Sequence, residues 1–223
     1  MKGSILNCIV ILYTCCISGL QPGDYQATNF EETAVGTLPS DWHLRRQSDV
    51  REYEVRSEDG NHYLHAATSS SDMMVVKKIS VDIVQYPFVT WRWRVHELPA
   101  NGDESVKQYC DVPASVSFVT NRTKLLPKSI KYTWSSTLPV GTVTESPFAF
   151  WPARTDIIVI DSGTDKQGQW VTVKRNILKD YKQLYGKTKV KSKKLTAIAI
   201  MSDSDNTGTA AIADYDEIVF SKY

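Results

Sequence analysis

The segment from Phe88 to Val95 alternates strictly between apolar and polar side chains. Trp91 and Trp93 fall on one face with two valines, whereas Arg92 and Arg94 fall on the other face with a threonine. A period of two residues is typical of a β-strand with one face in a core. Two tryptophans commit the inner face to a large apolar layer. The outer face is therefore either a solvated sheet surface or the floor of an anion-accepting groove.

Short alternating or apolar runs recur along the rest of the chain and are separated by turn residues. They predict strands at 53–55, 62–66, 75–81, 114–120, 130–134, 156–160, 170–174, 195–201 and 212–220. Only one segment has helical spacing, with Ile177, Tyr181 and Leu184 on one face, Asn176 as N-cap and Gly186 at the end. The pattern predicts an all-β fold, a two-sheet antiparallel β-sandwich of jelly-roll type, with one short helix near residues 177–185.

The amino-terminal segment differs in character from the remainder. A lone Lys2 precedes an apolar run from Ile5 to Ile17, which is typical of a secretory signal peptide and short for a membrane span. We expect residues 1–19 to be that signal and 20–223 to be a single exported domain, secreted or periplasmic. Lipid anchoring at Cys15 or Cys16 is the less favoured alternative, because the usual small residues do not precede them. No membrane span is expected after removal of the signal.

The charge balance bears on the class of partner, and the cysteine content bears on disulfide bonding. The 223 residues contain 26 Lys and Arg against 25 Asp and Glu, a net charge of +1. This balance disfavours nucleic acid as a partner. Cys110 is the only cysteine after the predicted signal, so no intramolecular disulfide is expected and the domain must rely on its core.

Three motifs in order resemble those of a known family. They are Trp-Arg-Trp-Arg at 91–94, Gly-Gln-Trp at 168–170 followed by Arg-Asn and Asp-Tyr at 175–181, and Met201–Gly208 followed by Ala-Asp-Tyr at 213–215. The mature chain resembles the DUF3047 family of uncharacterised exported domains over nearly its whole length. The resemblance implies a secreted or periplasmic domain with no established activity. Where the family tends to show an Asp-Asp pair followed by Ala-Arg, this chain reads Cys110-Asp111 and then Ala114-Ser115.

An acidic stretch near the carboxyl terminus suggests a cation site. Oxygen-bearing side chains alternate before Gly208, and further carboxylates follow a few residues later. Ca²⁺ prefers six to eight oxygen ligands of this kind. The predicted ligands of a structural calcium are Asp203, Asp205, Asn206, Asp214 and Asp216. The alternative is that the same residues simply form a hairpin turn.

A second set of residues suggests ligand binding. Arginines can neutralise the carboxylate of an acidic sugar, and aromatic rings offer flat platforms for sugars. The predicted ligand-binding residues are Arg92, Arg94, His96 and Tyr132, with Asp111 as the acid that remains from the family pair. The alternative is that Arg92 and Arg94 are surface charges whose stems cover apolar surface. We assign no catalytic residue, since no nucleophile, zinc, phosphate or dinucleotide motif is present.

Together these features predict an exported sandwich that binds a carbohydrate or another cell-envelope ligand without chemistry of its own. Fold analogy supports this as much as the residues do. One alternative is an enzyme, a lyase or hydrolase, that acts on acidic polysaccharides. Another is a structural or partner-binding envelope domain.

Overall fold

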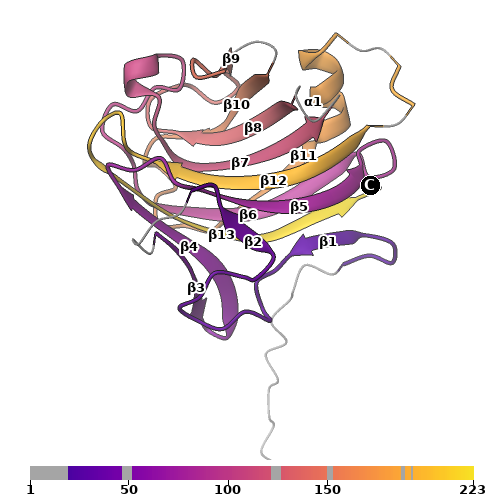
Figure 1. Ribbon diagram of the computed structural model, residues 1–223, viewed down its shortest axis with the longest axis horizontal. Helices are drawn as coiled ribbons and strands as arrows, with labels where there is room; N and C mark the ends of the chain where they lie inside the picture. Colours follow the sequence, from indigo (N-terminus) through magenta and orange to yellow (C-terminus); the bar gives the residue numbers. More distant parts are fainter. Residues whose placement is uncertain (1–19, 47–51, 122–126, 150–152, 187–188, 192) are drawn as a thin grey trace, which may run out of the picture.

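The computed structural model describes residues 20–223 except 47–51, 122–126, 150–152, 187–188 and 192. Two β-sheets pack face to face around one core (Figure 1). This arrangement confirms the predicted two-sheet sandwich. The predicted signal peptide lies outside the described residues.

The six-stranded sheet contains the alternating segment with Trp91 and Trp93. Its order is β11 (Val171–Asn176), β6 (Phe88–Glu97), β13 (Ala210–Ser221), β4 (Asn61–Ser69) and β3 (Tyr53–Glu58), and β1 (Tyr25–Thr28) also pairs with β13. All of its pairs are antiparallel. The central position of β6 and β13 explains their apolar inner faces, because strands on both sides hold them in the core.

The seven-stranded sheet has the order β2 (Trp42–Leu44), β5 (Met74–Asp82), β12 (Lys194–Asp203), β7 (Val112–Asn121), β8 (Pro127–Ser135), β10 (Arg154–Ser162) and β9 (Val143–Glu145). Its neighbours are antiparallel with one exception, since β8 and β10 run parallel. The chain reverses through β9, which pairs antiparallel with the far side of β10. A parallel neighbour needs such a return connection, and β9, which runs opposite to both β8 and β10, is part of it.

The predicted helix is present as α1 (Ile177–Leu184). The side chain of Asn176 accepts a hydrogen bond from the Lys179 amide at 2.9 Å, the geometry of an N-cap. Ile177 and Tyr181 are buried against the core. A short 3₁₀ helix (Lys107–Tyr109) precedes β7. Among the described residues, no helix is long and apolar enough to cross a membrane.

Aromatic side chains from both sheets fill the centre of the core. Trp91 and Trp93 are fully buried, and their rings lie edge to face with centroids 5.4 Å apart. Across the sheet interface, the ring centroids of Trp91 and Tyr132 lie 5.3 Å apart, and those of Trp93 and Trp134 lie 6.2 Å apart. The alternation in β6 and β8 therefore correctly identified the inner faces. It also implies that the residues between them, such as Arg92 and Lys131, point away from the core.

Candidate functional site

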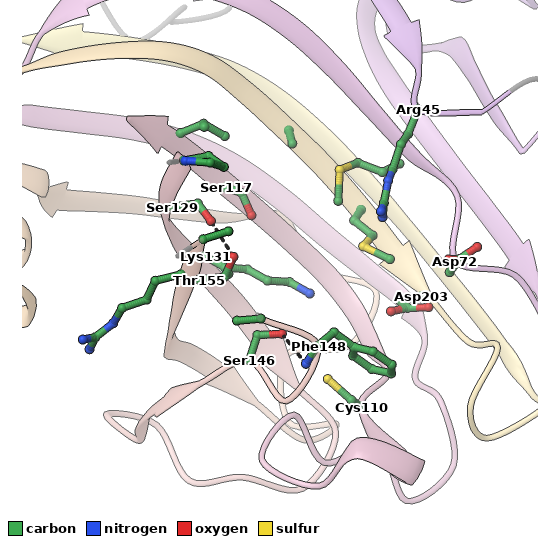
Figure 2. Close-up of a pocket in the computed structure, with 18 of the residues that line it drawn as sticks. Arg45, Asp72, Cys110, Ser117, Ser129, Lys131, Ser146, Phe148, Thr155 and Asp203 are labelled. Atoms are coloured by element: carbon green, nitrogen blue, oxygen red, sulfur yellow. Dashed lines mark hydrogen bonds between the residues drawn. The ribbon is translucent and has the colours of Figure 1, made fainter. Parts of the chain in front are cut away.

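The outer face of the seven-stranded sheet carries a cavity of about 580 Å³ (Figure 2). Ser117 and Val119 on β7, together with Ala199 and Met201 on β12, line its floor. Their neighbours in sequence point into the core, so these side chains are the outward ones. Most of the floor is made of small side chains, which leaves room above the sheet for a ligand.

The segment between β9 and β10 forms one wall of the cavity. Ser146, Phe148 and Ala149 belong to this wall. The Phe148 ring is 50% exposed, and the Lys107 ammonium lies 5.4 Å from its centroid. An aromatic ring held at the edge of a cavity provides a flat apolar contact surface.

Two cations face this space without a partner among the residues that the structure describes. Lys131 extends from the middle of β8, and Arg45 extends from the residue after β2, so that both charged ends point into the cavity (Figure 2). Within the described parts of the chain, neither side chain has a hydrogen bond or an ion pair. A third cation that lines the cavity, Arg154, is bound to Asp156 by three hydrogen bonds of 2.5–3.0 Å.

Three carboxylates meet at the end of β12. One oxygen each from Asp111, Asp203 and Asp205 lies within 4.8 Å of the others, so the cluster could hold a metal ion. Asp111 is fully buried and accepts hydrogen bonds from the amides of Asn206 and Thr207 at 3.2 and 2.7 Å. Among the described residues, the buried Oδ1 of Asp203 has no hydrogen-bond partner.

The charge state of Asp203 reflects this environment. Burial raises the pKa of Asp203 to about 8; Lys131 opposes the shift, and the carboxylates of Asp111 and Asp205 add to it. The charge of Lys131 offsets only part of the effect of burial, so an ionised Asp203 still lacks sufficient compensating positive charge. A cation at the cluster would supply that charge.

The predicted ligand-binding residues of β6 lie on the opposite side of the molecule, on the outer face of the six-stranded sheet. The Arg94 Nε donates to Asp214 at 2.8 Å, and Arg94 also pairs with Glu58. Arg92 donates to Asp216 at 2.5 Å. Both guanidinium groups stack on Trp170, with centroid distances of 4.9 and 4.7 Å. The outer face of β6 is thus neither a freely solvated row nor an open anion groove.

The carboxylate of Asp214 is the centre of this network. It accepts hydrogen bonds from His65 Nδ1 at 2.7 Å and from His96 Nε2 at 2.6 Å, besides that from Arg94. Burial by itself raises the pKa of Asp214, but the hydrogen bonds from both histidines outweigh it and hold the pKa well below its usual range. Burial raises the pKa of Asp216 to about 6, although Asn61 and Arg92 oppose the shift.

The residues predicted from sequence therefore divide into three places. Asp203 and Asp205 lie together with Asp111 and Asn206 at the cavity, whereas Asp214 and Asp216 lie on the other sheet and accept hydrogen bonds from arginines. Tyr132 belongs to the core, where its hydroxyl donates to Asp180 at 2.7 Å. A direct role of any of these residues in ligand binding stays a prediction.

Sequence reasoning did not select Lys131, Arg45 or Phe148. Lys131 had a usable signal, because it occupies the outward position between the core residues Ile130 and Tyr132. Arg45 and Phe148 lie outside long strands, so periodicity could not place them beside the cavity.

The fold and the cavity together define a β-sandwich with a ligand-sized hollow across one sheet. The chain belongs to the family described as protein of unknown function DUF3047, whose model matches residues 40–219. This match confirms the resemblance seen in the motifs. Among curated proteins, none matches the chain.

Several solved structures share the general sandwich arrangement at low sequence identity. The family 12 xyloglucanase from Bacillus licheniformis is 10% identical, covering 80% of this chain and 85% of its own, with a TM-score of 0.45. The xyloglucanase domain of NopAA from Sinorhizobium fredii, in complex with cellobiose, is 9% identical, covering 82% and 97%, with a TM-score of 0.44. TmCBM61 in complex with β-1,4-galactotriose is 10% identical, covering 87% and 94%, with a TM-score of 0.36.

Proposed function

We propose that the protein binds a glycan in the cavity on the seven-stranded sheet and performs no chemistry on it. The observation that supports this most directly is the composition of the cavity. Hydroxyl groups of Ser117, Ser129 and Thr155 line it together with charged side chains and the exposed ring of Phe148. The volume of about 580 Å³ falls in the range of small-molecule sites.

A sugar matches these groups better than a purely apolar ligand does. Its hydroxyls both donate and accept hydrogen bonds, as the hydroxyl of Ser117 can, and as Ser129 and Thr155, which bond to each other at 2.7 Å, can do with their remaining capacity. Its flat C–H faces pack on aromatic rings such as Phe148. An exported location, which we propose from residues 1–19, would bring the cavity into contact with envelope glycans.

The test is a glycan-array screen of the domain, followed by titration calorimetry with the glycans that bind. We expect binding to an oligosaccharide, reduced by a bulky residue in the floor, Ser117→Trp, and unaffected by Ser221→Trp at the end of β13. Binding that persists in Ser117→Trp would contradict this location. New reducing ends, or an absorbance from unsaturated sugars, would instead support the alternative of a hydrolase or lyase.

We also propose that the carboxylates of Asp111, Asp203 and Asp205 hold a calcium ion. The support comes from their oxygens within 4.8 Å of one another and from the buried Oδ1 of Asp203 without a hydrogen bond among the described residues. Calcium accepts carboxylate and amide oxygens in flexible geometry, whereas Mg²⁺ demands a tighter octahedron. Asn206 lies beside the cluster, where its side-chain amide nitrogen donates to Asp111 at 3.0 Å and to Asp205 at 2.6 Å.

Thermal melting in Ca²⁺ and in chelator tests the calcium proposal. A ligand of the folded state adds about 2.7 kcal/mol at a hundredfold excess over its dissociation constant, so calcium should raise the melting temperature by several degrees. The double variant Asp203→Asn with Asp205→Asn should abolish the difference. Asp214→Asn, on the other sheet, should retain it. Equal melting temperatures of a metal-free preparation with and without Ca²⁺ would contradict the proposal.

A further inference from the structure

We propose that the glycan bound in the cavity is anionic, with a carboxylate or sulfate group held between Lys131 and Arg45. This inference rests on the glycan-binding function proposed above and names the class of ligand. It uses residues that the sequence patterns did not single out.

The position of Lys131 is the first support. Its side chain leaves the middle of β8, is half-buried, and ends within the cavity (Figure 2). Within the described residues the ammonium has no hydrogen-bond acceptor, and because it ends in a cavity it is accessible to an anionic group of a ligand. Lys131 lowers the pKa of Asp203 through its charge, yet the two groups form no ion pair. An acceptor from a ligand would satisfy the ammonium.

Arg45 supplies a second cation from a different part of the chain. Its backbone amide donates to the carbonyl of Met74 at 2.8 Å, which fixes the start of the side chain beside β5. From there the guanidinium reaches toward the same space as Lys131 (Figure 2). A guanidinium can donate two parallel hydrogen bonds to a carboxylate or sulfate, and the ammonium can donate a further one.

Other cations of the protein differ from Lys131 and Arg45 because they bind carboxylates of the protein itself. Arg92, Arg94 and Arg175 each donate to a buried carboxylate on the protein itself. Arg154 lines the same cavity but is likewise neutralised by Asp156. Among the described cations that line the cavity, Lys131 and Arg45 alone have no acidic partner among the described residues.

A neutral ligand would leave both positive charges without an acceptor of opposite charge. An anionic ligand supplies such acceptors and so adds charge-assisted hydrogen bonds, which are about twice as strong as neutral ones. The cavity should therefore discriminate between a charged glycan and the same glycan after its charge has been removed.

The experiment compares matched pairs of oligosaccharides by calorimetry. The carboxylate pairs are galacturonan, mannuronan and hyaluronan fragments with their carboxyl-reduced forms, and the sulfate pair is a sulfated galactan fragment with its desulfated form. We expect at least one charged member to bind and its neutral counterpart to bind at least about tenfold more weakly. Which pair responds separates carboxylate from sulfate. Binding of the preferred charged glycan should also weaken with added salt.

Variants connect the preference to the two residues. Lys131→Met and Arg45→Gln should each weaken binding of the charged glycan about tenfold and leave the neutral one unchanged. Lys131→Arg keeps the charge and should retain most of the affinity. Lys179→Met, which removes the same charge from the exposed side of α1, is the control, and melting temperatures verify that every variant is folded.

The failures of the two proposals are distinguishable. If charged and neutral members of each pair bind equally, or if Lys131→Met and Arg45→Gln bind the charged glycan like wild type, the ligand class is wrong while glycan binding stands. If no member of the panel or of the array binds, glycan binding itself is overturned.

Discussion

The charged side chains on the outer faces of the two sheets differ in their partners. On the six-stranded sheet, Arg92 and Arg94 donate to Asp216 and Asp214 and stack on Trp170. On the seven-stranded sheet, Lys131 and Arg45 face a cavity without a partner among the described residues. Charges that satisfy one another within the protein hold strands together, whereas charges beside an open space are available to a ligand. The difference supports the proposal that the cavity face binds the ligand, while the ion pairs of the other face stabilise its sheet.

The aspartates of the two faces express the same contrast. Histidine hydrogen bonds hold the pKa of Asp214 well below its usual range, while burial raises the pKa of Asp203 to about 8. Both side chains are almost completely buried. The partners, rather than the degree of burial, therefore decide which charge state each carboxyl group prefers.

The largest effect is expected from Asp214→Ala. The change removes the acceptor that Arg94 and two histidines share. Removing one partner of a buried ion pair typically lowers the free energy of unfolding by about 3–5 kcal/mol. Urea denaturation measures the loss. Asp205→Ala, at an exposed position beside the cavity, should change the free energy of unfolding by less than about 1 kcal/mol. Equal losses in the two variants would remove the distinction between the faces.

A second prediction concerns a carboxyl group that forms no ion pair with a described residue. Glu104 is fully buried, accepts a hydrogen bond from Ser135 at 2.6 Å, and has its pKa raised by burial from 4.5 to about 7. The folded protein therefore keeps a proton that the unfolded chain releases, so stability falls as the pH rises from about 4.5 to about 7. At pH values above about 7, burial of the ionised Glu104 lowers the free energy of unfolding by about 3 kcal/mol.

Glu104→Gln removes this cost. The variant should be more stable than wild type by up to about 3 kcal/mol near pH 8, with the advantage disappearing toward pH 4.5. Denaturation across this pH range gives the curve, and Glu97→Gln, at an exposed position, serves as the control. A constant difference between Glu104→Gln and wild type at every pH would mean that ionisation of Glu104 is not the cause.

The smallest change in stability is expected from Phe148→Ala. The ring is half exposed, so its removal should alter the free energy of unfolding by no more than about 0.5 kcal/mol. Glycan affinity, in contrast, should fall about tenfold, because the flat contact surface is lost. Phe148→Tyr keeps a ring and should bind like wild type. Loss of stability without loss of binding would place Phe148 in the scaffold.

Periodicity was sufficient to predict most of the fold. The alternation of Trp91 and Trp93 with arginines identified the inner face of β6, and helical spacing with Asn176 located α1. The parallel pairing of β8 with β10 was not predicted. Strand direction depends on how a connection travels between strands, and residue alternation is identical for both directions.

The candidate site was predicted less completely. Asp111, Asp203 and Asp205 were selected for their chemistry, but their proximity depends on the register of β7 against β12, which pairs Asp203 with Val112. Arg92 and Arg94 were selected because arginines on a strand can face a ligand. Sequence alone could not show that β13 would place carboxylates directly opposite, with Asp216 and Asp214 in register with them.

The seven-stranded sheet begins with β2 and ends with β9, and each is only three residues long. An unpaired strand edge is a template on which another chain can add a strand, and a longer edge offers more hydrogen bonds. The ten-residue strands β7 and β12 lie inside the sheet, where both edges are occupied. Self-association by sheet extension at these two ends is therefore disfavoured, even though the face that carries the cavity is open to solvent.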